Sequence, residues 1–112
     1  MILHNYLSNL GRDLIYEYIN SLPEAEKIDG YTVLQHMEKG EFDKILFKRW
    51  EKKVYEVYFQ KNNRVFYITV DKENIYLLHS CRKQKNKTEK KDANIVRKRA
   101  KELGNMLGRK FI

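Results

Sequence analysis

Cysteine and proline are almost absent from this 112-residue sequence, which contains one of each, Cys81 and Pro23. A single cysteine cannot close an internal disulfide, and a zinc site built on cysteine pairs is excluded as well. The simplest expectation is a protein of a reducing, cytoplasmic setting.

Long hydrophobic runs are also missing. No apolar stretch approaches the roughly 20 residues that a membrane-spanning helix needs. The N-terminal residues 1–5 have neither the basic region nor the apolar segment of a secretory signal. We therefore expect a protein that is neither secreted nor inserted in a membrane.

Metal and cofactor motifs are lacking too. The three histidines (His4, His36 and His79) are scattered, and no pair of acidic residues has ligand spacing. There is no P-loop, no glycine-rich dinucleotide loop and no nucleophile elbow. We expect no metal and no cofactor, so any phosphodiester chemistry should rest on side chains alone.

What the sequence has in excess is positive charge, and this charge is unevenly placed. Residues 1–43 carry three basic and eight acidic residues, a net charge of −5, whereas residues 44–112 carry 20 and seven, a net charge of +13. A surface of that sign attracts polyanions and releases their counterions. Nucleic acid is the expected partner, with an acidic protein second.

The length and the hydrophobic fraction of 42% suit one folded domain spanning residues 1–112. Apolar residues at helical spacing between Leu10 and Leu22 predict a first helix, capped by Ser8 or Asn9 and stopped near Ser21 by Pro23. A second helix should start at Pro23 and end at Gly40.

From Lys44 the hydrophobic period changes from 3.6 to 2, which indicates strands. Further strands are predicted at Val54–Phe59, Arg64–Val70 and Ile75–Cys81, and a last helix at Lys90–Leu103, capped by Thr88 or Asp92. The predicted fold class is α+β: two N-terminal helices, a four-stranded antiparallel meander and a C-terminal helix, with the helices on one face of the sheet.

Several polar residues of this sheet are candidates for chemistry. Arg64 opens the third strand and Lys83 follows the fourth, so the two cations could converge at one edge, or could simply be solvated charges. His79 ends an apolar strand and could move a proton near pH 7, or serve only as a hydrogen-bonded strand end. Glu56 lies in an aromatic strand and, if buried, needs a cation such as Arg64 or Lys48.

Tyrosines and the basic last helix leave similar alternatives open. Tyr58, Tyr67 and Tyr76 could stack on unpaired RNA bases or pack in the core. The cationic face that includes Arg97 and Arg99 could follow phosphates, hold an acidic partner, or only keep the protein soluble.

Several short motifs, taken in their order along the chain, resemble those of one protein family. Val54-Tyr-Glu-Val, Arg64-Val-Phe-Tyr67, Leu77-Leu-His79, Lys83 and Lys87-Thr88 together resemble the RelE/ParE superfamily of bacterial toxins. Within it the similarity is greatest to the HigB-like branch related to the phage Gp49 proteins. The resemblance implies a RelE-like fold.

The resemblance also implies an activity, that of a toxin of a type II toxin–antitoxin system that cleaves mRNA on the ribosome and so inhibits translation. It assigns Arg64 and Lys83 to phosphate charge, His79 or Glu56 to proton transfer, and Tyr67 to base stacking or orientation. The residues expected to bind RNA are Lys48, Arg82, Lys85, Lys87, Arg97 and Arg99.

The partners implied are mRNA, the ribosome and a HigA-like helix-turn-helix antitoxin, with operator DNA bound only through the toxin–antitoxin complex. Two alternatives remain. One is a ParE-like toxin that inhibits DNA gyrase without cleaving RNA, and the other is a plain nucleic-acid-binding domain.

Overall fold

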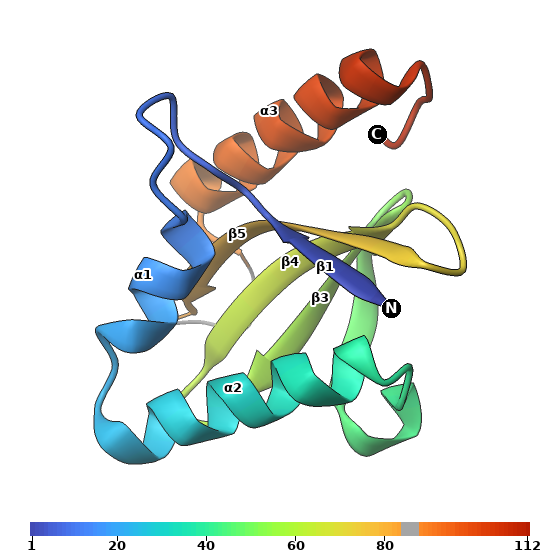
Figure 1. The fold of residues 1–112 in the computed structure, drawn as a ribbon. Coiled ribbons are helices and arrows are strands. Elements are labelled where there is room, and N and C mark those ends of the chain that lie inside the picture. The colour runs from blue at the N-terminus through green and yellow to red at the C-terminus, as the bar shows by residue number, and fades with distance from the viewer. Residues whose placement is uncertain (84–87) are drawn as a thin grey trace.

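Five strands form one mixed sheet in the computed structural model, which describes residues 1–83 and 88–112 (Figure 1). The strand order is β1-β5-β4-β3-β2. In chain order the elements are β1 (Ile2–Asn5), α1 (Leu14–Asn20), α2 (Glu24–Glu38), the short 3₁₀-helix η1 (Phe42–Lys44), β2 (Leu46–Glu51), β3 (Val54–Phe59), β4 (Asn63–Thr69), β5 (Asn74–Arg82) and α3 (Lys90–Leu107).

The strands β2 to β5 are antiparallel neighbours, as the change of period predicts. The turn between β3 and β4 places Lys61 and Asn62 at φ values of 64° and 63°. Two adjacent residues with positive φ give a turn whose twist matches that of the strands it joins. A bulge between Phe66 and Tyr67 shifts the register with β5.

The prediction of a four-stranded antiparallel meander is wrong, because a fifth strand completes the sheet. β1 pairs in parallel with β5, with Leu3 opposite Ile75 and Asn5 opposite Leu77. This strand is only four residues long, too short for a period to stand out in the sequence. It forms because β5 offers a free edge and Leu3 packs against the core.

The prediction that all helices cover one face is also wrong. Figure 1 shows α1 and α2 on one side of the sheet and α3 on the other. The strands supply apolar residues to both sides, so each face needs a cover. One core, which includes Ile15, Met37 and Val57, lies under α1 and α2, and a second, which includes Phe66 and Val96, lies under α3.

The first helix begins later than its apolar spacing predicts. Asp13 is the N-cap and accepts a hydrogen bond from the backbone N–H of Tyr16 at 2.8 Å, so α1 starts at Leu14 rather than after Ser8 or Asn9. Leu10 is 88% exposed and lies in the preceding turn. The second helix ends as predicted, with Gly40 at a φ of 71° just after its C-cap.

The last helix is one turn longer than predicted and ends at Gly108, which adopts the left-handed conformation. Its N-cap is Glu89, not Thr88 or Asp92. Among the helices that the structure describes, none has the length and apolar character needed to cross a membrane.

Candidate active site

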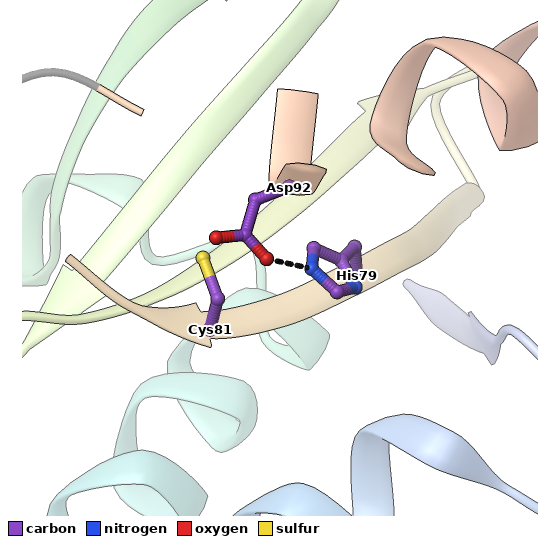
Figure 2. Close-up of side chains that lie close together, drawn as sticks. All are labelled: His79, Cys81 and Asp92. Atoms are coloured by element: carbon purple, nitrogen blue, oxygen red, sulfur yellow. Dashed lines mark hydrogen bonds and ion pairs between the residues drawn. The ribbon is translucent and has the colours of Figure 1, made fainter. Parts of the chain in front are cut away.

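His79, near the end of β5, makes two polar contacts with α3. Its Nε2 lies 2.8 Å from Oδ1 of Asp92, and its Nδ1 lies 3.4 Å from Nη1 of Arg99 (Figure 2 shows the first contact). A guanidinium can only donate, so Nδ1 accepts and Nε2 carries the hydrogen given to Asp92. The ring therefore turns its basic nitrogen toward Arg99.

The surroundings of His79 favour its neutral form. Burial lowers the pKa of His79 below its usual 6.5, the hydrogen bond and the charge of Asp92 oppose this effect, and the positive charge of Arg99 lowers the pKa further. A histidine that is neutral at physiological pH can accept a proton during a reaction.

This lowered pKa makes folding stability depend on pH. The unfolded chain takes up a proton near pH 6.5 while the folded His79 still resists it, so the free energy of unfolding should fall as the pH drops below about 6.5. His79→Gln should flatten this part of the curve. Urea unfolding at a series of pH values from 7.5 to 5 measures the difference, and equal slopes for the two proteins would contradict it.

Arg99 is held in place from three sides. Its Nη1 donates to the backbone oxygen of Leu78 at 2.8 Å, as well as facing His79. Its guanidinium carbon lies 4.0 Å from the centre of the Tyr6 ring, a cation–π contact that keeps the plane of the group fixed. Arg99 is thus an oriented cation next to a neutral histidine.

His79 and Arg99 line a surface groove of about 340 Å³ between α1, β5 and α3. The other lining residues come from α1 and β5: Leu14, Ile15, Glu17, Tyr18 and Ser80. A ligand in this groove would lie against both His79 and Arg99.

A second charged cluster lies beside the first, around a completely buried carboxylate. Oε1 of Glu56, on β3, is 2.9 Å from Nζ of Lys83 and 3.2 Å from Nε of Arg64. Glu56 is 0% exposed and Lys83 is 5% exposed. A carboxylate buried this deeply needs such partners, because the loss of its hydration is otherwise uncompensated.

Arg64 is the more accessible of the two cations. Its side chain is 16% exposed, and its guanidinium carbon lies 4.5 Å from the centre of the Tyr58 ring. Within the described residues Oε2 of Glu56 has no hydrogen-bond partner. Two cations share this one carboxylate, so the cluster has a formal net positive charge, with Arg64 on its more exposed side.

Cys81 lies between the two clusters. It is opposite Arg64 in the β4–β5 register and two residues beyond His79, and Figure 2 shows its thiol facing Asp92. Burial, helped by the charge of Asp92, raises the pKa of Cys81 to about 12, so the thiol is protonated. Residues two apart along a strand are roughly 7 Å apart, so the clusters occupy one continuous stretch of the α3 face.

Of the five residues that the family resemblance assigns to catalysis, Arg64, Lys83 and Glu56 lie in one cluster and His79 lies in the neighbouring one. Tyr67 lies elsewhere. It is 2% exposed and packs in the core under α2, against Phe42 and Tyr55. Burial raises its pKa above the usual 10. With only 2% of its surface exposed, Tyr67 offers too little area for a base to stack on.

The predicted RNA-binding residues are spread over several surfaces. Lys48 is exposed on the edge strand β2. Arg97 pairs with Glu51, and Arg82 binds Glu26 and the backbone oxygen of Lys61. Arg99 belongs to the His79 site. Lys85 and Lys87 lie outside the described residues.

Two residues of the site are not predicted from the sequence. The sequence indicates Asp92 only as a possible helix cap, and it gives no indication of a role for Tyr6. Asp92 lies 13 residues beyond His79 in the sequence, and no spacing rule predicts that the two side chains meet. A carboxylate in the first turn of a helix that follows the strand is the only signal that the sequence offers.

With this geometry established, comparison with known proteins places the chain in a family. Residues 17–101 match the family described as "Phage derived protein Gp49-like (DUF891)". A search of curated proteins finds no match. The matched segment covers most of the chain and includes His79, Asp92, Arg99, Arg64 and Glu56. This protein therefore belongs to the Gp49-like family.

Family membership confirms the resemblance drawn from the sequence to the phage Gp49-related, HigB-like branch of the RelE/ParE superfamily. It indicates a toxin of a toxin–antitoxin system, and hence an antitoxin as partner.

Proposed function

We propose that this toxin is an endoribonuclease that inhibits translation by cutting mRNA on the ribosome, without a catalytic metal ion. The observation that carries the proposal is the orientation of His79. Asp92 holds its proton on Nε2, so that Nδ1 is the basic nitrogen and lies next to Arg99, and both residues line the groove. A neutral histidine beside a fixed cation can act on a phosphodiester.

The reaction that this arrangement supports is attack by the neighbouring ribose hydroxyl. As substrate binds, Nη1 of Arg99 shifts from Nδ1 of His79 to the phosphate. Nδ1 then takes the proton of the 2′-OH, and O2′ forms a bond to phosphorus. Asp92 stabilises the imidazolium that results, as a carboxylate does for a general base. The bond from phosphorus to O5′ then breaks, and the imidazolium returns the proton to the leaving O5′.

The cations stabilise the charge that builds on phosphorus. Arg99 is the guanidinium nearest to His79 and would contact the non-bridging oxygens directly. Arg64 contributes from the neighbouring cluster, on its more exposed side. Glu56 and Lys83 are buried, so we assign Glu56 to positioning Arg64 and Lys83 rather than to proton transfer.

Docking on the ribosome would use further cations of the chain. Lys48 on β2 and Arg97 on α3 are exposed and remain in this proposed set. Lys85 and Lys87, which lie outside the described residues, stay in it on the sequence alone. Contacts of this kind are electrostatic, so binding should weaken as the salt concentration rises. The proposed antitoxin is a HigA-like helix-turn-helix protein whose acidic segment covers the same charge, and through which the complex would bind operator DNA.

The proposal can be tested by inducing the protein in bacteria and mapping message 5′ ends across the transcriptome. We expect new 5′ ends within translated regions in the wild type and about a hundredfold fewer with Arg99→Ala, because the charge at the reacting phosphate is lost. Lys98→Ala is the matched control, since Lys98 is the exposed neighbouring residue on the same helix.

Other results of the same experiment would favour one of the two alternative functions. Growth arrest with intact messages and trapped gyrase would favour the ParE-like alternative. Normal growth without new ends would favour a plain nucleic-acid-binding domain. Arg64→Ala should also lower cleavage, and cleavage that persists unchanged in both arginine variants would refute the assignment of these two residues.

A further inference from the structure

Three side chains that differ in chemistry meet where β5 faces the first turn of α3. They are the imidazole of His79, the thiol of Cys81 and the carboxylate of Asp92, and one ligand atom from each lies within 4.8 Å of the other two. Figure 2 shows the imidazole and the thiol both turned toward the carboxylate. Each of the three is a ligand that zinc accepts in proteins.

We propose that His79, Cys81 and Asp92 form a binding site for zinc or a similar transition-metal ion, which competes with catalysis. The assignment of the ligands is independent of the proposed ribonuclease activity, and only the inhibitory effect rests on that activity. One nitrogen, one sulfur and one oxygen favour zinc or cobalt over magnesium or calcium, which prefer oxygen ligands.

The geometry requires only small movements. Bonds of about 2.0 to 2.3 Å to a tetrahedral ion place its ligand atoms roughly 3.3 to 3.7 Å apart. The His79–Asp92 contact of 2.8 Å would have to open slightly, and the sulfur would have to approach. Because a strand and a helix hold the backbone in place, we expect these shifts to come from rotation about the side-chain bonds.

The protein supplies a sheltered site with one position left open. Cys81 and Asp92 are each 8% exposed, and the His79 side chain is 14% exposed. Three protein ligands leave a fourth position for water. The thiolate and the carboxylate together cancel the two positive charges of the ion, once the thiol has released its proton to solvent.

Binding of a metal and the proposed catalysis would exclude each other. Coordination through Nε2 moves the ring hydrogen to Nδ1, so the basic nitrogen is lost. The new N–H would also face the guanidinium of Arg99, which now lies 3.4 Å from Nδ1 as a donor. Two donors cannot share that contact, so Arg99 would shift away from Nδ1. The ion would thus remove the base of the reaction, because no basic nitrogen would be left on His79.

Titration of the purified, metal-free protein with Co²⁺ tests the site without any RNA. Cys81 is the only cysteine in the chain, so a thiolate-to-cobalt charge-transfer band can arise only there. We expect one Co²⁺ per chain with tetrahedral absorption, displacement by Zn²⁺, and loss of the charge-transfer band in Cys81→Ser and Cys81→Ala. His79→Gln and Asp92→Asn should each weaken binding at least tenfold.

His4→Gln is the matched control, because His4 bonds to Asn74 outside the cluster and should not affect the titration. Thermal melting establishes that each variant is folded. A wild type with no charge-transfer band, or a band whose affinity is the same in His79→Gln and Asp92→Asn, would overturn the proposal. Half an equivalent per chain would overturn it as well, since it would mean that Cys81 joins two chains.

The inhibitory effect is measured separately, as the ratio of message cleavage with and without zinc for each protein. At zinc concentrations that fill the site, cleavage by the wild type should be at least tenfold lower than without zinc. For Cys81→Ser, cleavage with and without zinc should be nearly equal. An equal ratio in both proteins would refute inhibition through this site. A complete absence of cleavage would instead refute the proposed function, and leave the cobalt result to decide on the metal site.

Discussion

His79→Gln should lower the rate of message cleavage by about 10²- to 10⁴-fold, the usual loss when a general base is removed. The glutamine side chain can still donate a hydrogen bond to Asp92, so the fold should survive. What it lacks is a basic nitrogen next to Arg99. Single-turnover cleavage of a defined message on purified ribosomes measures the rate directly, and separates chemistry from docking.

His4→Gln provides the control for this substitution. His4 is also partly buried and hydrogen-bonded, with its Nε2 2.8 Å from Asn74, but it lies outside the groove. The His4→Gln protein should therefore cleave messages at the wild-type rate. If His79→Gln retained more than a tenth of the wild-type rate while folded, another residue would have to be the base.

Glu56→Ala should destabilise the fold by about 3–5 kcal/mol, the largest effect on stability that we expect from one substitution. The change leaves Lys83, 5% exposed, as a buried cation without its carboxylate. It also releases Arg64, which shares the same oxygen. Urea unfolding gives the free energy, with the midpoint expected to drop while the slope stays constant.

Glu51→Ala is the contrasting variant, since it breaks an ion pair whose side chains are 47% (Arg97) and 34% (Glu51) exposed. Its cost should stay below about 1 kcal/mol. The double variant Glu56→Leu with Lys83→Met should recover most of the stability lost in Glu56→Ala, because it leaves no unpaired charge from the pair. A cost of less than about 1 kcal/mol for Glu56→Ala would show that the buried cluster matters little to folding.

Much of the architecture is predictable because it rests on local patterns. The second helix, the three strands β3 to β5 and the last helix follow from their hydrophobic periods and their glycine and proline boundaries. β1 is different, since four residues carry too little pattern and become a strand only through β5. The position of α3 likewise depends on which face α1 and α2 leave uncovered.

Some contacts of the candidate site are likewise predictable from the sequence, and others are not. Arg64 and Lys83 meet because antiparallel strands bring the start of β4 and the end of β5 to one edge, which the sequence predicts. The contacts of His79 with Asp92 and Arg99 join β5 to α3, and no local sequence rule predicts them. Tyr67 could have been separated from Arg64 by alternation alone, because residues three apart on a strand point to opposite faces.

The most direct test of the account is the chemistry of the cut ends. Attack by the 2′-OH with loss of O5′ leaves a 5′-hydroxyl on the downstream fragment, so its end should join a sequencing adapter only after treatment with polynucleotide kinase. We predict this result for the wild type and the near absence of such ends for His79→Gln. Downstream fragments that carry a 5′-phosphate and join the adapter without the kinase would contradict it.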